Sequence, residues 1–218
     1  MKGKKIVFYG LMFLPLMGAL AALWFLPEQI PGHYDSDNQV TRWGSKYEVL
    51  IVPIVTVVLG LFFLGMAKVA ARQEEHGNNN EKVCIAAGIV TLLIFNAMTG
   101  YILYAGFHKV ENLSSHPWDV NQILFGLLGI GMIILGNIMP KLRMNAVTGL
   151  KTRWSMKNET TWKKSQRFGG ISYIIGGAVI VVICFFVRGM YCFLAAAAVI
   201  AVLLAVDVFY TYKIAQRC

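Results

Sequence analysis

The chain has 218 residues, of which 57% are hydrophobic and only 14% are charged. This charged share is about half of that in an average soluble domain, so the composition excludes a soluble globular protein and a disordered one. The formal net charge is +9. In a chain this apolar, such a charge bears on membrane orientation rather than on binding of nucleic acid.

Six apolar stretches are each long enough to cross a bilayer as a helix, which takes roughly 20 residues. They lack strict alternation and are too long for the strands of a membrane barrel. The sequence therefore predicts an all-α integral membrane protein with six transmembrane helices. In chain order, the expected spans are residues 6–26, 49–67, 83–107, 120–139, 168–187 and 190–212.

Basic residues indicate how these spans are oriented. Sixteen of the 20 Lys and Arg residues fall in the two termini and in the loops after spans two and four. Because cytoplasmic segments carry the excess of Lys and Arg, we expect both termini to be cytoplasmic.

The first span has a rival interpretation. Lysines precede its apolar run, and Ala19-Leu20-Ala21 could serve as the cleavage site of a secretory signal. The run is longer than the usual core of such a signal, so we expect a retained anchor. Cleavage would leave the topology of the later spans unchanged.

The spans divide into two expected units. Residues 1–70 form a two-helix unit with a structured outer loop over 27–47, and residues 83–212 form a four-helix unit with a basic cytoplasmic loop over 140–167. The outer loop combines prolines with Asp and Asn, which favours a structured but non-helical segment. Its candidates for contact with an outside ligand are Pro27, Pro31, His33, Trp43 and Lys46.

The basic loop carries eight Lys or Arg residues and one acidic residue, Glu159. Asn158 is a suitable N-cap, so the fifth helix is expected to begin at Glu159 and to continue directly into the membrane. Topogenic charge or contact with anionic lipid accounts for part of the basic character. It does not account for the tryptophans, asparagine and glycine, which indicate a shaped segment. The candidates for contact with a cytosolic partner are Asn145, Gly149, Lys151, Thr152, Trp154, Ser155, Glu159, Trp162, Lys164 and Arg167.

Two polar residues inside the spans are further candidates. Asp207 is the only carboxylate within an expected span. Such groups are functional candidates by default, although its place near the cytoplasmic end also suits a structural pairing. Asn96, in the middle of the third span, is expected to hydrogen-bond between helices. Pro15 and Pro53 could kink the first two spans.

Metal binding and enzyme activity have little support in the sequence. No pair of outer His and Asp residues has the spacing of a zinc site, so we expect solvated loop residues and no metal or other cofactor. Cys184 and Cys192 flank the last turn and could meet, but buried free thiols are expected. No metalloprotease, phosphate-loop or serine-hydrolase motif is present, so no enzyme is expected. The outer His and Asp residues are His33, Asp35, Asp37, His108, His116 and Asp119.

The basic loop resembles the SdpI family of bacterial membrane proteins. Leu150-Lys151 stands for the family's Ile-Arg, Arg153 for its Pro, and Ser165-Gln166 for its Thr-His, so position 166 has no imidazole. The outer loop resembles a small domain of unknown function that often precedes this family. The resembling elements are Gly136-Asn137, Pro140-Lys141, Asn145, residues 149–152, Trp154-Ser155, Asn158-Glu159, Trp162, Lys164-Ser165, Arg167 and Gly169-Gly170 in the basic loop, and Leu26-Pro27, residues 30–33 and residues 43–46 in the outer loop.

The resemblance implies a bacterial cell-membrane protein with a role in toxin immunity. The family's named member protects its cell from a secreted peptide toxin and holds a cytoplasmic repressor at the membrane. By resemblance, the partners would be membrane lipid, a peptide toxin outside and a cytosolic DNA-binding repressor inside, without direct contact to nucleic acid. Two other hypotheses remain. One is a small transporter or permease component, with a path lined by Asp207, Asn96 and the two proline-bearing spans. The other is an enzyme that acts on lipid or peptide through the outer His and Asp residues.

Overall fold

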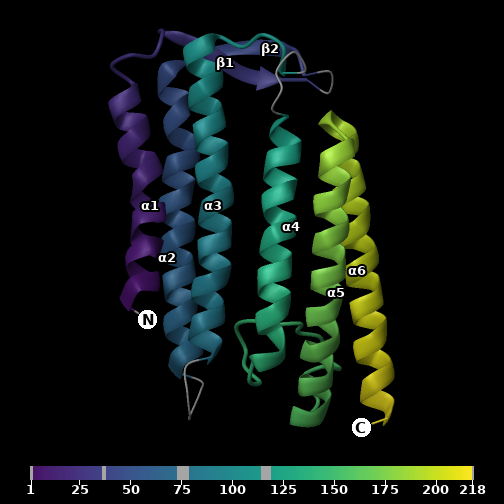
Figure 1. The fold of residues 1–218 in the computed structure, drawn as a ribbon. Helices are drawn as coiled ribbons and strands as arrows, with labels where there is room; N and C mark the ends of the chain where they lie inside the picture. The colour runs from purple at the N-terminus through teal and green to yellow at the C-terminus, as the bar shows by residue number, and fades with distance from the viewer. Residues whose placement is uncertain (1, 36–37, 73–78, 114–118, 218) are drawn as a thin grey trace.

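The computed structural model describes residues 2–35, 38–72, 79–113 and 119–217, and they are mostly helical (Figure 1). In this described part of the chain, six helices are long and apolar enough to cross a membrane, which confirms the six predicted spans. The fifth begins at Glu159, as its predicted N-cap indicates, and Asn158 Oδ1 accepts a hydrogen bond from Thr161 N at 2.8 Å. The helices are α1 Lys2–Ala22, α2 Ile51–Arg72, α3 Asn79–His108, α4 Val120–Ile138, α5 Glu159–Phe186 and α6 Gly189–Arg217, with short 3-10 turns η1 Lys46–Leu50 and η3 Met139–Lys141.

The prediction of an all-α fold is wrong at one place, the loop over residues 27–47. This loop holds two antiparallel strands, β1 Gln29–Tyr34 and β2 Val40–Ser45. Pro31 pairs with Trp43, and the pairing becomes irregular after Pro31, which has no N–H to donate to the ladder. The expected non-helical segment is therefore a β-hairpin.

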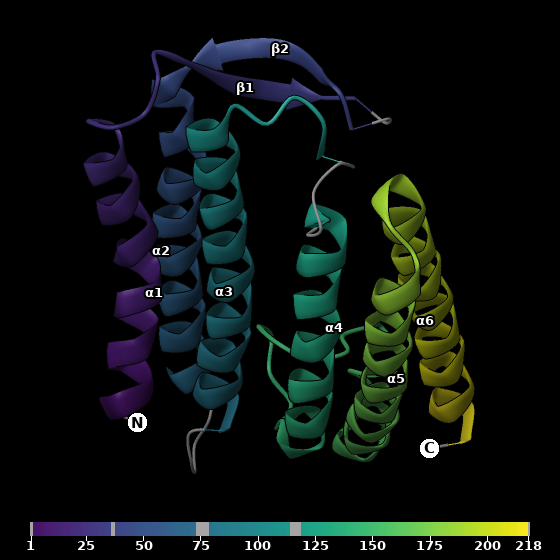
Figure 2. The same cartoon turned by 45° about the horizontal axis from the view of Figure 1, so that its top comes forward.

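The helices stand side by side in two groups of three, and the hairpin crosses one end of the bundle (Figures 1 and 2). Helices α1, α2 and α3 pack together, and α4 packs against α5 and α6. We call the end with the β-hairpin the hairpin end, and the end with residues 142–158 the loop end. Both chain termini lie at the loop end (Figure 1). The division into units 1–70 and 83–212, and the side of the membrane that each end faces, stay predictions.

A proline and an asparagine connect α1 to α3. Pro15 lies inside α1 and has no N–H, so the carbonyl of Leu11 loses its usual helical donor. Asn96 Nδ2 of α3 donates to this carbonyl at 2.8 Å and to Leu92 O at 2.7 Å. The interhelical role expected for Asn96 is thus confirmed, and the polar pair replaces the hydrogen bond that Pro15 removes.

Glycines bring the backbones of α4 and α5 into direct contact. A Cβ on Gly136 would lie 2.5 Å from the carbonyl oxygen of Gly170, and one on Gly129 would lie 2.7 Å from that of Gly177. No other residue fits at such separations. Small residues of this kind allow close helix packing where lipid supplies no hydrophobic driving force. We call these four residues the glycine seam.

Large apolar side chains cover the outside of the helices. Phe62, Val182 and Val202 are each more than half exposed. In water such an apolar surface would favour aggregation, whereas hydrocarbon solvates it. The outward faces therefore agree with the apolar length of the helices in indicating lipid as the surrounding solvent.

Candidate functional site

The basic loop begins with a turn built on Asn145. Its buried side chain accepts hydrogen bonds at Oδ1 from the backbone N–H groups of Val147 (2.8 Å) and Thr148 (2.7 Å), and it donates from Nδ2 to Arg143 O at 2.8 Å. Asparagine is suited to this role because its short amide mimics a backbone turn. Asn80, at the start of α3, accepts from Arg143 N at 3.1 Å and connects the turn to the other group of helices.

Gln166 of α5 holds the middle of the loop. Its fully buried amide accepts from Leu150 N at 2.9 Å and donates to Leu150 O at 3.0 Å. Gly149 has φ +110°, and a Cβ there would lie 2.7 Å from Gln166 Oε1. Only glycine therefore fits beside this amide. Sequence reasoning treated Gln166 only as a departure from a histidine. Its place one turn after Trp162, on the same helix face, could have pointed to burial.

Hydrogen bonds from two loop side chains, Thr152 and Lys157, attach the loop to α6. Thr152 N donates to Ser155 Oγ at 2.8 Å, and Thr152 Oγ1 donates to Thr211 Oγ1 at 3.0 Å. Lys157 Nζ donates to Ala215 O at 2.8 Å, near the C-terminal end of α6, where a cation is favoured by the helix dipole. The loop is thus fastened to the last helix through both neutral and charged groups.

Trp162 is the central apolar residue beneath the loop. It is 1% exposed and packs with Val83, Met139 and Leu142. Its Nε1 donates to Leu142 O at 2.9 Å, so the one polar atom of the ring is paired. Because Val83 belongs to α3 and Met139 to η3, Trp162 joins helices from both groups at the loop end.

The structure separates the ten loop candidates into buried and accessible residues. Buried ones would act on a partner only through the loop that they shape. Trp154 is accessible and packs edge-on against Tyr212 of α6, with ring centroids 5.2 Å apart. Contact with a partner stays a prediction for all ten. Buried are Asn145, Ser155 and Trp162; half-buried are Gly149 and Thr152; exposed are Lys151, Trp154, Glu159, Lys164 and Arg167.

The hairpin carries the five candidates for contact with an outside ligand. His33 and Trp43 are exposed, whereas Pro31 is buried and Pro27 half-buried. Lys46 Nζ lies 2.8 Å from Glu28 Oε1 and is thus ion-paired. The exposed residues among the five, His33 and Trp43, lie on different strands of the hairpin.

An ion pair joins strand β2 of the hairpin to the 3-10 turn η1. Arg42 Nη1 and Nη2 donate to the two carboxylate oxygens of Glu48, each at 2.8 Å. This hydrogen-bonded guanidinium lowers the pKa of Glu48 below its ordinary value. Gly44 lies against the same carboxylate, which leaves no room there for a side chain.

Hydrogen bonds hold the hairpin on the segment that follows α3. Tyr34 Oη donates to Val110 O at 2.8 Å, and Leu113 N donates to Asn38 O at 3.0 Å. Burial raises the pKa of Tyr34 to about 12. The strands of the hairpin are therefore held against the segment that follows α3.

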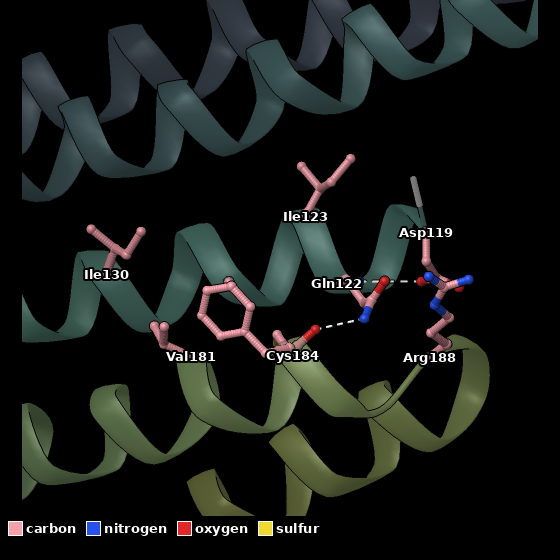
Figure 3. Close-up of a pocket in the computed structure, with 9 residues that line it drawn as sticks. Asp119, Gln122, Ile123, Ile130, Val181, Cys184 and Arg188 are labelled. Carbon is pink, nitrogen blue, oxygen red and sulfur yellow. Dashed lines mark hydrogen bonds between the residues drawn. The ribbon is translucent and has the colours of Figure 1, made fainter. Parts of the chain in front are cut away.

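A cavity of about 370 Å³ lies between α4 and α5 towards the hairpin end (Figure 3). Asp119 caps α4 by accepting from Asn121 N at 2.8 Å, and its second oxygen accepts from Gly189 N at 2.9 Å. Gln122 Nε2 donates to Cys184 O at 2.6 Å. Figure 3 shows Asp119 and Arg188 at one end of this cavity. The polar groups at its rim thus also join α4 to the turn between α5 and α6.

The two intramembrane candidates lie in different places. Asp207 is fully buried and lines a cavity of about 330 Å³ together with loop residues 148–151. Asn96 faces α1 instead, and it is not among the residues that line this cavity. The structure therefore does not bring the two together.

The cysteine expectation is confirmed for Cys184 and Cys192, which are buried and free, with their Sγ atoms 3.5 Å apart. Among the described residues, no group of three or more His, Cys, Asp or Glu side chains could hold a metal ion. Two residues of the outer His and Asp set, Asp37 and His116, lie outside the described residues.

Comparison with known proteins finds a family match for the region that contains the basic loop. Residues 141–211, which include the basic loop and all of α5, match the SdpI/YfhL protein family. These residues carry the sequence pattern of this family. Residues 10–57, which include the hairpin, match a domain of unknown function, DUF1648. Both resemblances found in the sequence are confirmed. With six long apolar helices in its described part, the chain is a multi-pass membrane protein.

Two relatives come from Bacillus subtilis. The immunity protein SdpI is 26% identical over 185 residues, which cover 84% of this chain and 82% of the relative. The uncharacterized protein YfhL is 36% identical over 59 residues, which cover 25% of this chain and 54% of the relative. No solved structure matches the chain.

Proposed function

We propose that this protein is an immunity protein that protects a bacterial cell from a secreted peptide toxin. The observation that carries the proposal is the similarity to an immunity protein over 84% of the chain. Expression in a toxin-sensitive bacterium should raise the peptide concentration needed to stop growth. If expression of correctly inserted protein leaves sensitivity to related peptides unchanged, the proposal fails.

The chain is oriented with both termini and the basic loop in the cytoplasm. Support comes from the excess of Lys and Arg in the termini and in the loops at the loop end. In a chain whose four native cysteines are replaced by serine, single cysteines placed by His33→Cys and Glu159→Cys test the orientation in intact cells with a membrane-impermeant thiol reagent. The His33→Cys variant should react in intact cells, whereas the Glu159→Cys variant should react only after the cells are permeabilised. The reverse pattern would refute the orientation.

The toxin meets the hairpin end. His33 and Trp43 are exposed on the hairpin, and an exposed aromatic side chain contributes contact area at low entropic cost. Trp43→Ala should therefore lower resistance to the peptide. Tyr191→Ala is a matched control, since Tyr191 is 77% exposed at the start of α6, outside the hairpin. An equal loss in both variants would contradict a specific role of the hairpin.

The basic loop holds a cytosolic DNA-binding repressor at the membrane while toxin is present. Its cations are presented on a scaffold fixed by Asn145, Gln166 and Trp162. Pull-down with and without peptide should show a DNA-binding protein that co-purifies only after challenge. Lys164→Gln with Arg167→Gln should abolish this, whereas Lys68→Gln on α2, at the same end but outside the loop, should not.

A small transporter or permease component is the second candidate. One observation favours it, the buried carboxyl group of Asp207 in a cavity between helices. Reconstituted vesicles should then show solute flux that disappears in Asp207→Asn. Lack of flux with any solute would exclude this candidate.

A further inference from the structure

Two adjoining cavities lie between α3, α4, α5 and α6. Their volumes are about 330 Å³ and 300 Å³. Ala87, Leu135, Tyr173 and Leu204 line both, so the two cavities share a wall and adjoin. Each volume falls within the range of pockets that hold small organic molecules, roughly 300–1,000 Å³.

Asp207 lines the cavity that lies nearer the loop end. The side chain is fully buried, and neither carboxyl oxygen has a hydrogen-bond partner among the described residues. Ser172 of α5 is a potential hydrogen-bond donor to the carboxyl group, but no hydrogen bond of good geometry joins the two among the described residues, and Tyr173 lies within electrostatic reach. A buried carboxyl group without donors is costly, because nothing replaces the water that it has lost.

Among the described residues that line this cavity, the only other charged side chain is Lys151, which is hydrogen-bonded elsewhere. Its Nζ donates to Ala146 O at 2.6 Å, and no ion pair joins it to Asp207 in the described part of the chain. The remaining walls are almost entirely apolar. The lining therefore combines one acidic group with an apolar space, which is the complement of an apolar molecule with one cationic group.

We propose that this space binds a small apolar molecule carrying one protonated primary amine. The ammonium group donates hydrogen bonds to the carboxylate of Asp207 and supplies the missing counter-charge. The apolar body lies between α3, α4 and α6, against Leu135, Leu203 and Leu204. The occupant also touches the basic loop, because residues 148–151 close the loop end of the cavity.

A molecule bound in the cavity would also affect the basic loop through helix α6. Thr211 follows Asp207 by one helical turn on α6 and accepts the hydrogen bond from Thr152 Oγ1 at 3.0 Å. A bound ammonium group that fixes Asp207 therefore also steadies the contact between the loop and α6. Bound amine should slow cleavage of the loop by trypsin after Lys151.

Calorimetric titration of the full chain in detergent micelles tests the site, with n-octylammonium and n-octanol as probes of equal length. Wild type should bind octylammonium at least tenfold more tightly than octanol. In Asp207→Asn the preference for the amine should disappear. Glu159→Gln removes an exposed carboxylate and should behave as wild type, which controls for partition of the amine into micelles.

Two more variants keep the test decisive if Asp207→Asn does not fold. Ala87→Leu fills space shared by both cavities and leaves the carboxyl group in place, so it should weaken amine binding at least tenfold. Lys151→Gln removes the competing cation and should leave amine binding equal or tighter. Equal affinity of wild type for octylammonium and octanol, or weaker binding of the amine in Lys151→Gln, would overturn the proposal.

Discussion

Replacement of Gln166 by methionine tests whether this buried amide holds the basic loop in place. Methionine has a similar length but no hydrogen-bonding amide, so Gln166→Met leaves the Leu150 N–H without the acceptor that now lies at 2.9 Å. A buried donor left unsatisfied costs about 1–3 kcal/mol. The opened form of the loop should then be populated roughly 5- to 150-fold more than in wild type.

Trypsin cleavage after Lys151 measures this opening. The next backbone N–H, that of Thr152, is bonded to Ser155 Oγ at 2.8 Å, so the peptide bond must leave its place before it can be cut. Cleavage tracks the open population when closing is faster than cutting. Lys163→Met changes an exposed residue of the same helix and should change the rate less than threefold. Cleavage of Gln166→Met at the wild-type rate would refute a structural role for the amide.

Three other predictions concern packing, redox chemistry and pH. Gly136→Ala should lower the melting temperature in detergent, at a cost of about 1–3 kcal/mol for overpacking, whereas Gly126→Ala on the same helix has nothing within 4 Å and should not. Mild oxidation should join Cys184 to Cys192, whose sulfurs are 3.5 Å apart, and mass spectrometry of the peptides should show the loss of two hydrogens; free thiols after oxidation would contradict the geometry. The pKa of Glu48 is lowered by its arginine partner, so the ion pair is fully present above pH 4.5 and is lost as pH falls through the lowered pKa. An NMR titration of this carboxyl group at or above its ordinary pKa would show that the pair is absent.

Local signals explain which parts of the fold could be predicted from the sequence. The start of α5 depends on Asn158 and the next three residues, and it was predicted correctly because a helix cap involves only near neighbours. The hairpin was not predicted as a sheet. Its two strands are close in sequence, but Pro31 lies within β1 and is an unfavourable residue for a strand.

The site shows the same division between local and tertiary effects. Asn96 could be interpreted from sequence, since an amide in the middle of a span has few partners other than a neighbouring helix. Gln166 could not, because its partner Leu150 is positioned only when the loop folds back on α5. Likewise the burial of Trp162 and the exposure of Trp154 follow from the path of the loop and not from the residue type.

The glycine seam has a consequence for variation among related chains. Its contacts occur at two levels seven residues apart on each helix, Gly129 with Gly177 and Gly136 with Gly170. Sliding α4 along α5 by one helical turn would bring Met132 or Ile133 to a place where only glycine fits, so these contacts help to fix the axial register of the two helices. The connecting segment does not have to set their relative height. A change in the length of the basic loop would therefore leave the relative height of the two helices beneath it unchanged.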